Sequence, residues 1–119
     1  MKIATISFWH LHAKDYAKEA MAHPGTDLVA VWDEDRQRGI AAAREHQIEF
    51  VEDLDEILSN TSIEGVIVCS PTADHRDVVI RCVHAGKHVF MEKVLASTLQ
   101  DATAIVDAAR QEDVALVVS

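Results

Sequence analysis

Polar side chains that can bind a ligand or move a proton follow two apolar runs of the sequence. Glu92 and Lys93 directly follow the run 88–91, and Asp33 directly follows the run 28–32. A lysine at such a position can exchange a proton with a hydroxyl or carbonyl group that undergoes hydride transfer, and partial burial would lower its pKa towards a useful range. The alternative is a solvated pair of surface charges.

Asp33 is placed to bind a nucleotide. An acidic side chain at the end of a second strand, about 20 residues after the first βα turn, can hydrogen-bond both ribose hydroxyls of adenosine. Its charge, next to Glu34, disfavours a 2′-phosphate, so the sequence favours NAD over NADP, although Arg36 and Arg38 soften that exclusion. The alternative is that Asp33 caps the following helix.

The first βα turn, residues 7–13, contains no glycine. A dinucleotide-binding turn has the pattern G-x-G-x-x-G, which lets the backbone approach a pyrophosphate. Its glycine positions hold Ser7, Trp9 and His12, and Trp9 would obstruct that approach unless the loop is remodelled. We still expect these residues and His10 to line a cofactor site.

The pair His10 and His12 has the residue types of a metal site. No Asp, Glu or Cys stands near the two histidines at an obvious ligand spacing, so we predict no metal. A polar contact with a ligand and simple packing at the start of a helix are the alternatives.

A turn rich in small polar groups follows the apolar run 65–69, and it contains Ser70, Pro71 and Thr72. Pro71 ends the strand because it has no N–H to donate, and Thr72 or Asp74 can cap the helix behind it. By themselves these residues indicate only a turn.

Strands and helices alternate along the whole chain. Strands are predicted at 2–6, 28–32, 48–51, 65–69, 88–91 and 115–118, with amphipathic helices between them. Capping boxes at 53–56 and 97–100 begin two helices, and Gly86 is placed to end another. In the last helix we expect an inward face of Leu99, Ala102, Ile105, Val106 and Ala109. This alternation predicts an α/β fold, a doubly wound, Rossmann-like parallel sheet of about six strands with helices on both faces.

The composition is that of one ordinary globular domain. The chain has 119 residues and a net charge of −9, which disfavours nucleic acid and anionic membrane surfaces as partners. No apolar run reaches the ~20 residues of a membrane span, and no signal peptide is evident, so we expect a cytoplasmic protein. Cys69 and Cys82 stand in apolar runs and are expected in the core.

Taken together, residues 65–75 and 84–93 resemble the Gfo/Idh/MocA family. The shared pattern is an apolar strand, a Ser/Thr-Pro turn with a histidine four positions after the proline, then A-G-K-H-V, two residues and E-K-P. Here Val94 replaces the last proline. The resemblance implies cofactor contacts from the turn and the second strand, and it implies roles as catalytic lysine for Lys93 and ribose-binding acid for Asp33. The implied cofactor contacts are Ser70, Pro71, Thr72, His75, Glu92 and Lys93.

Members of that family are typically NAD(P)-dependent oxidoreductases acting on sugars, polyols and related compounds. The resemblance implies that residues 1–119 are the cofactor-binding domain. It also implies that a C-terminal domain, absent here, supplies the substrate site and the interface of a homo-oligomer. The isolated domain would then be inactive. Two other functions stay open: a cofactor-binding regulatory or scaffold protein without turnover, and a redox-neutral hydrolase or lyase that uses His10 and His12.

Overall fold

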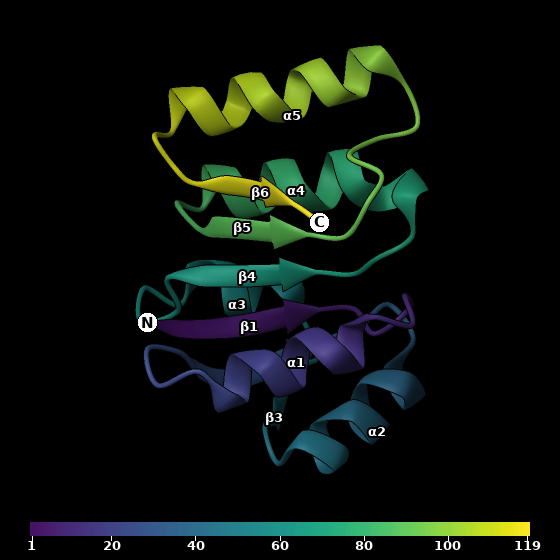
Figure 1. Ribbon diagram of the computed structural model, residues 1–119, viewed down its shortest axis with the longest axis vertical. Helices are drawn as coiled ribbons and strands as arrows, with labels where there is room; N and C mark the ends of the chain where they lie inside the picture. The colour runs from purple at the N-terminus through teal and green to yellow at the C-terminus, as the bar shows by residue number, and fades with distance from the viewer.

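Six parallel strands form a single sheet in the computed structural model, which describes residues 1–119. The strands are β1 (Lys2–Ile6), β2 (Asp27–Trp32), β3 (Glu49–Phe50), β4 (Gly65–Val68), β5 (His88–Met91) and β6 (Leu116–Val118). Their order across the sheet is β3-β2-β1-β4-β5-β6, and every neighbouring pair is parallel (Figure 1). The predicted Rossmann-like fold is confirmed.

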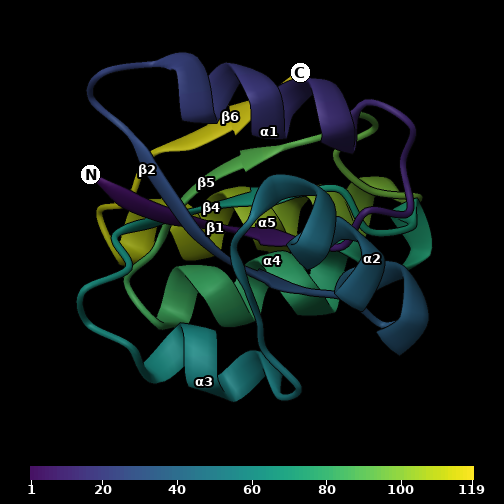
Figure 2. The ribbon, with the colours of Figure 1, turned by 90° about the horizontal axis from the view of Figure 1, so that it is seen from below.

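Helices cover both faces of this sheet (Figure 2). They are α1 (Ala13–Ala22), α2 (Arg36–His46), α3 (Leu54–Ser59), α4 (His75–His84) and α5 (Leu99–Gln111), with a short 3-10 turn, Thr72–Asp74, before α4. Buried residues of α1 and α2 pack with one face, and those of α3, α4 and α5 pack with the other. An apolar groove of about 380 Å³ beside α1 is lined in part by Ile3, Ile67 and Phe90.

The strands β2 and β3 are added on one side of β1, and β4, β5 and β6 are added on the other. The strand order therefore reverses between the neighbours β1 and β4. In open α/β sheets, ligands bind outside the carboxyl ends of the strands at such a point. The loops after β1, β2, β4 and β5 all leave the same edge (Figure 1), and we call it the ligand edge. All the candidate residues named above lie there.

Two helix starts differ from the predictions. Thr98, not Ser97, caps α5, because its hydroxyl accepts the N–H of Asp101. Asp53 caps α3 as predicted, but its partner is the N–H of Asp55, and the side chain of Glu56 makes no return bond.

The start of α4 and the face of α5 also differ. Neither Thr72 nor Asp74 caps α4 with its side chain, because the 3-10 turn satisfies the first amides through backbone carbonyls. Leu99 is 83% exposed, not inward. It shares its line along the helix with Val106, whereas the buried stripe runs through Ile105 and Ala109.

Lys87 is a buried cation beneath the larger core. Its Nζ donates to the carbonyl oxygens of Asn60 and Ile63, both at 2.8 Å, and burial lowers its pKa. Just before it, Gly86 has a φ of 73°, the left-handed conformation that ends α4. Cys69 and Cys82 are both buried and free, as predicted. None of the helices has the length and apolar character needed to cross a membrane.

Candidate functional site

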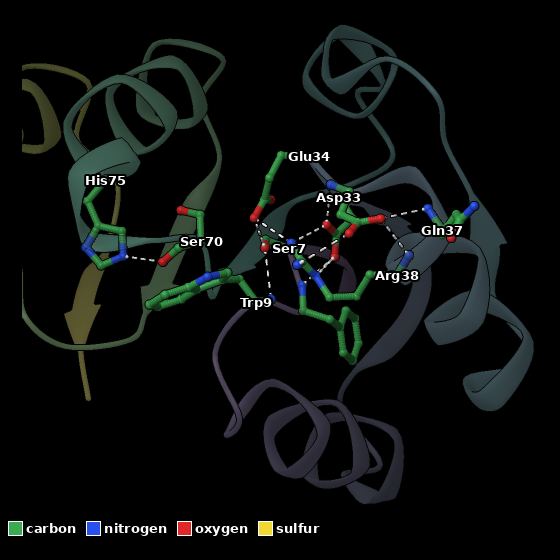
Figure 3. Close-up of polar contacts among 10 residues, drawn as sticks. Ser7, Trp9, Asp33, Glu34, Gln37, Arg38, Ser70 and His75 are labelled. Atoms are coloured by element: carbon green, nitrogen blue, oxygen red, sulfur yellow. Dashed lines mark hydrogen bonds and ion pairs between the residues drawn. The ribbon is translucent and has the colours of Figure 1, made fainter.

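Asp33 directly follows β2, and its buried carboxylate accepts hydrogen bonds with both oxygens (Figure 3). Its Oδ2 accepts the backbone N–H of Phe8 at 2.8 Å and Nε–H of Arg38 at 3.0 Å. Its Oδ1 accepts Nη2–H of Arg38 at 2.7 Å and the N–H of Asp35 at 2.8 Å. Asp33 therefore ties the β1–α1 loop to α2, and the residue that caps α2 is Asp35 instead.

The guanidinium of Arg38 lies among three carboxylates. Besides Asp33, it approaches Glu34 at 2.6 Å and Asp35 at 4.0 Å. Burial lowers the pKa of Arg38, but the hydrogen bonds to Asp33 and the charges of all three acids raise it above its usual value. Gly39 makes this close packing possible, because a Cβ there would lie 2.8 Å from Cβ of Asp33.

The loop from residue 7 to 13 satisfies most of its own amides. Ser7 has a φ of 70°, which suits glycine better than serine, and its hydroxyl donates to Glu34 while accepting the N–H of Trp9. The side chain of Trp9 is 52% exposed. The other loop amides with acceptors inside the protein belong to Ser7, Phe8, His10, His12 and Ala13. Only the N–H of Leu11 has no acceptor.

His75 is completely buried and joins the turns after β4 and β5. Its Nε2 lies 3.0 Å from the carbonyl oxygen of Ser70 (Figure 3), and its Nδ1 lies 2.8 Å from that of Val94. The side chain of Ser70 is also buried, and its Oγ has no hydrogen-bond partner in the protein. Thr5 Oγ1 and His46 Nε2 are buried without a partner in the same way. Pro71 and Thr72 are half-buried beside Ser70.

Glu92 brings the β1–α1 loop, α1 and β5 together. Its carboxylate is 1% exposed, and Oε2 accepts the hydroxyl of Tyr16 at 2.7 Å and lies 2.9 Å from Nδ1 of His12. Nδ1 of His10 is 3.4 Å from the same oxygen. Oε1 accepts the backbone N–H of Lys93. Burial raises the pKa of Glu92, but these hydrogen bonds and the charge of His10 outweigh it, so that the pKa is lowered.

Lys93 is exposed, unlike its neighbour Glu92. Its Nζ makes no hydrogen bond or ion pair with any residue of the chain. The structure does not give this lysine the partial burial considered above, because β5 ends at Met91 and Glu92 takes the last buried position. The Lys93–Val94 peptide bond is cis.

Residues 8–119 match the model of the Gfo/Idh/MocA family, an oxidoreductase family with an NAD-binding Rossmann fold. The chain belongs to this family. It is 36% identical over 96 residues to a scyllo-inositol 2-dehydrogenase (NAD(+)) of Bacillus subtilis, covering 80% of this chain and 27% of that protein. It is 33% identical over 105 residues to a 1,5-anhydro-D-fructose reductase of Ensifer adhaerens, covering 87% of this chain and 32% of that protein.

A solved structure supports the same family. A putative myo-inositol dehydrogenase from Sinorhizobium meliloti superposes with a TM-score of 0.92 at 25% identity, covering 100% of this chain and 36% of that one. The chain thus spans about a third of the length of these Gfo/Idh/MocA proteins. It is an NAD(P)-binding Rossmann domain, and its curated relatives include dehydrogenases named for NAD+ and for NADP+.

The structure sorts the predicted site residues of this Gfo/Idh/MocA domain into two groups. Lys93 and Trp9 are exposed, and His10 and His12 are partly so, which leaves them accessible to a ligand. Ser7, Asp33, Ser70, His75 and Glu92 are buried and position their neighbours. Their predicted contacts with a cofactor stay predictions.

Three features of the site escaped the sequence analysis. The first is Tyr16 of α1, whose hydroxyl donates to Glu92. The fork of Arg38 on Asp33 was also missed, although Gly39, a glycine inside a helix, marks a close approach. The expectation that no acid stands near His10 and His12 is wrong, because the sheet order carries Glu92 to them across 80 residues.

Proposed function

We propose that the protein is an NAD(P)-dependent oxidoreductase that acts on a hydroxyl group of a sugar, polyol or related small molecule. The observation that carries the proposal is Lys93, an exposed amine without an internal partner at the ligand edge, directly after the buried Glu92. The names of the relatives, inositol dehydrogenases and an anhydrofructose reductase, support the same class of substrate.

At the ligand edge, the end of β2 fits a dinucleotide better than the β1–α1 loop does. Asp33 stands at the strand end where a ribose-binding acid is needed, and a ribose bound there would take the place of Arg38 on its oxygens. In contrast, the β1–α1 loop has a single free amide, at Leu11, so it lacks the usual cradle for a pyrophosphate. The proposal therefore assigns phosphate contacts to side chains of this loop, with His10 and His12 as candidates.

Bound NAD(P) supplies the hydride acceptor or donor. Lys93 exchanges a proton with the substrate oxygen. Its neutral amine accepts the hydroxyl proton when the hydroxyl becomes a carbonyl, and its ammonium group returns a proton to that oxygen in the reverse direction. The buried Glu92 fixes the start of this turn by accepting the backbone N–H of Lys93. His75 fixes the turn from the other side, through the carbonyl oxygen of Val94.

The charges around Arg38 support NAD over NADP in this proposal. An arginine near the ribose can accommodate a 2′-phosphate, but here its charge is shared among Asp33, Glu34 and Asp35. A phosphate dianion would therefore meet an excess of negative charge. Because the curated relatives include one dehydrogenase named for NAD+ and one named for NADP+, this preference has to be measured.

Because the chain spans about a third of the length of its relatives, the proposal places most of the substrate pocket outside residues 1–119. It places the subunit interface of a homo-oligomer there as well. The whole protein is proposed to work in the cytoplasm on a small molecule, without nucleic acid or membrane partners.

The test uses the whole protein, a panel of inositols and anhydro sugars, and the absorbance of reduced nicotinamide. Lys93→Ala should lower turnover about 1,000-fold, in the range of a lost general acid or base, while the affinity for NADH changes little. The matched control is Lys18→Ala, an exposed lysine of α1 away from the ligand edge, which should leave turnover unchanged.

Retained turnover in Lys93→Ala would remove this lysine from the mechanism. A second candidate function, a cofactor-binding protein without turnover, is favoured by the engaged amides of the β1–α1 loop. In that case no substrate of the panel is oxidised or reduced by the wild-type protein, although NADH binds.

A further inference from the structure

Two imidazoles and one carboxylate meet at the ligand edge. One ring nitrogen of His10, one of His12 and a carboxylate oxygen of Glu92 all lie within 4.8 Å of one another. We propose that these three side chains bind a divalent transition-metal ion, of the kind that accepts mixed imidazole and carboxylate ligands, with Zn²⁺ the best match. This set of two histidines and one acid occurs in catalytic zinc sites and in non-haem iron sites.

The distances from Glu92 to the two imidazoles fit an ion with little movement. Zinc binds nitrogen and oxygen ligands at about 2.0–2.2 Å, which in a tetrahedral site puts two ligand atoms about 3.4 Å apart. Nδ1 of His10 is already 3.4 Å from Oε2 of Glu92. Nδ1 of His12 is 2.9 Å from that oxygen, a hydrogen-bonding distance, and needs to move outward by only about half an ångström.

The hydrogen bonds around His10 argue for a cation at this place. The backbone N–H of His12 donates to Nδ1 of His10 at 3.3 Å, so this ring nitrogen carries a lone pair, and this long hydrogen bond is given up when the lone pair binds an ion. The same nitrogen faces Oε2 of Glu92, which is also an acceptor. Two acceptors that face each other gain from a positive ion between them, and no lysine or arginine is paired with Glu92.

The carboxylate is held in advance. Tyr16 donates its hydroxyl to Oε2 of Glu92 at 2.7 Å, and the backbone N–H of Lys93 holds Oε1 at 3.0 Å. The ring of Tyr16 packs edge-on against Phe90, with centroids 5.0 Å apart. Outer partners of this kind fix the orientation of a metal-binding carboxylate and raise the affinity of the site.

The site leaves room for a further ligand. The side chain of His12 is 42% exposed and that of His10 is 16% exposed, whereas Glu92 closes the inner side. Three protein ligands with one open side are typical of metal sites that bind water or a substrate oxygen rather than of structural sites. An ion here would take an oxygen ligand such as a hydroxyl, carbonyl or phosphate group, and the phosphate contact proposed above for His10 and His12 would then run through the ion.

The chain contains a matched control for this cluster. His84 and Glu112 form another histidine–carboxylate pair, with Nδ1 3.0 Å from Oε1. Both side chains are about half exposed, and the pair does not belong to a group of three ligands. If pairing alone explained metal binding, His84 would contribute as much as His12.

The experiment uses the whole protein, stripped with a chelator and titrated with Zn²⁺ alone, without cofactor, by calorimetry and elemental analysis. Wild type should bind one equivalent. His10→Ala, His12→Gln and Glu92→Gln should each weaken binding at least about 100-fold, and Tyr16→Phe about 10-fold, as for an outer partner. His84→Ala should change nothing. Replacement by Co²⁺ should give visible absorption bands that His12→Gln removes.

Circular dichroism of each variant shows whether it is folded, and His12→Gln and Glu92→Gln keep nearly the original volume. Binding below half an equivalent in wild type overturns the proposal, as does binding that survives the folded double variant His10→Ala/His12→Gln. Because the titration contains no nicotinamide cofactor or substrate, its outcome is independent of the Lys93 test and of the proposed oxidoreductase activity.

Discussion

Two buried carboxylates stand at the same edge of the sheet and are satisfied in opposite ways. Asp33, at the end of β2, is 5% exposed and meets a permanently charged guanidinium, that of Arg38. Glu92, after β5, is 1% exposed and meets only a phenol, two imidazoles and an amide. The first acid is locked in a charge pair, whereas the second has only partners without a permanent charge, and we propose it as a metal ligand. Burial alone therefore does not separate an acid held by a cation from one held by neutral groups.

The largest effect is expected at Asp33. Asp33→Ala leaves the fork of Arg38 and the amides of Phe8 and Asp35 without their acceptor, so we expect the free energy of unfolding to fall by about 3 kcal/mol. The measurement is urea unfolding. As a control, Asp55→Ala breaks the exposed pair with Arg81 and should lower stability by less than about 1 kcal/mol. Similar losses in the two variants would show that the Asp33 pair is not special.

His75 tests how firmly the turn on the β5 side is fixed. His75→Ala opens a cavity and removes the ring between the carbonyl oxygens of Ser70 and Val94, which should lower stability by about 2 kcal/mol. In the whole protein it should also weaken NADH binding, because Ser70 loses its support. The contrast is His23→Ala, an exposed histidine at the end of α1, which should do neither. Unchanged NADH affinity in a folded His75→Ala protein would separate this turn from the cofactor.

Tyr16→Phe removes one hydrogen bond from Glu92, together with the exposed bond between the Tyr16 hydroxyl and Oγ of Ser119, and keeps the ring. The free energy of unfolding should fall by about 1 kcal/mol, the usual value of such a bond. A double-mutant cycle of Tyr16→Phe with Glu92→Gln should give a smaller coupling energy than a cycle of Asp33→Ala with Arg38→Ala. Equal couplings would remove the distinction between the two acids.

The smallest effect concerns the choice of cofactor. Glu34→Gln removes one of the three carboxylates around Arg38 without touching Asp33, so the preference for NAD over NADP should fall about fivefold, or about 1 kcal/mol. The ratio of the two kcat/KM values in the whole protein measures it. Glu45→Gln is the control, since this acid pairs with Lys14 instead. No shift would mean that the 2′ position does not lie near Glu34.

Local patterns were enough to predict the elements and the sheet. The strands at residues 2–6 and 88–91 have the predicted bounds. The long-range contacts of the site were not predictable in this way. Glu92 meets His12 only because β5 and β1 flank β4, and Arg38 reaches Asp33 only because Gly39 lets α2 lie close. Leu99 was misplaced because helical spacing alone does not say which of two neighbouring stripes faces the core.

Chemical labelling of Lys87 can report local unfolding of the protein. The other lysines, Lys2, Lys14, Lys18 and Lys93, are exposed and will react with an amine-directed reagent in the native state. Lys87 is 3% exposed and held by two carbonyl oxygens, so its amine becomes reactive only when the segment around Asn60 and Ile63 detaches. The rate at which Lys87 is labelled, relative to Lys93, therefore follows local unfolding of the core without any engineered probe.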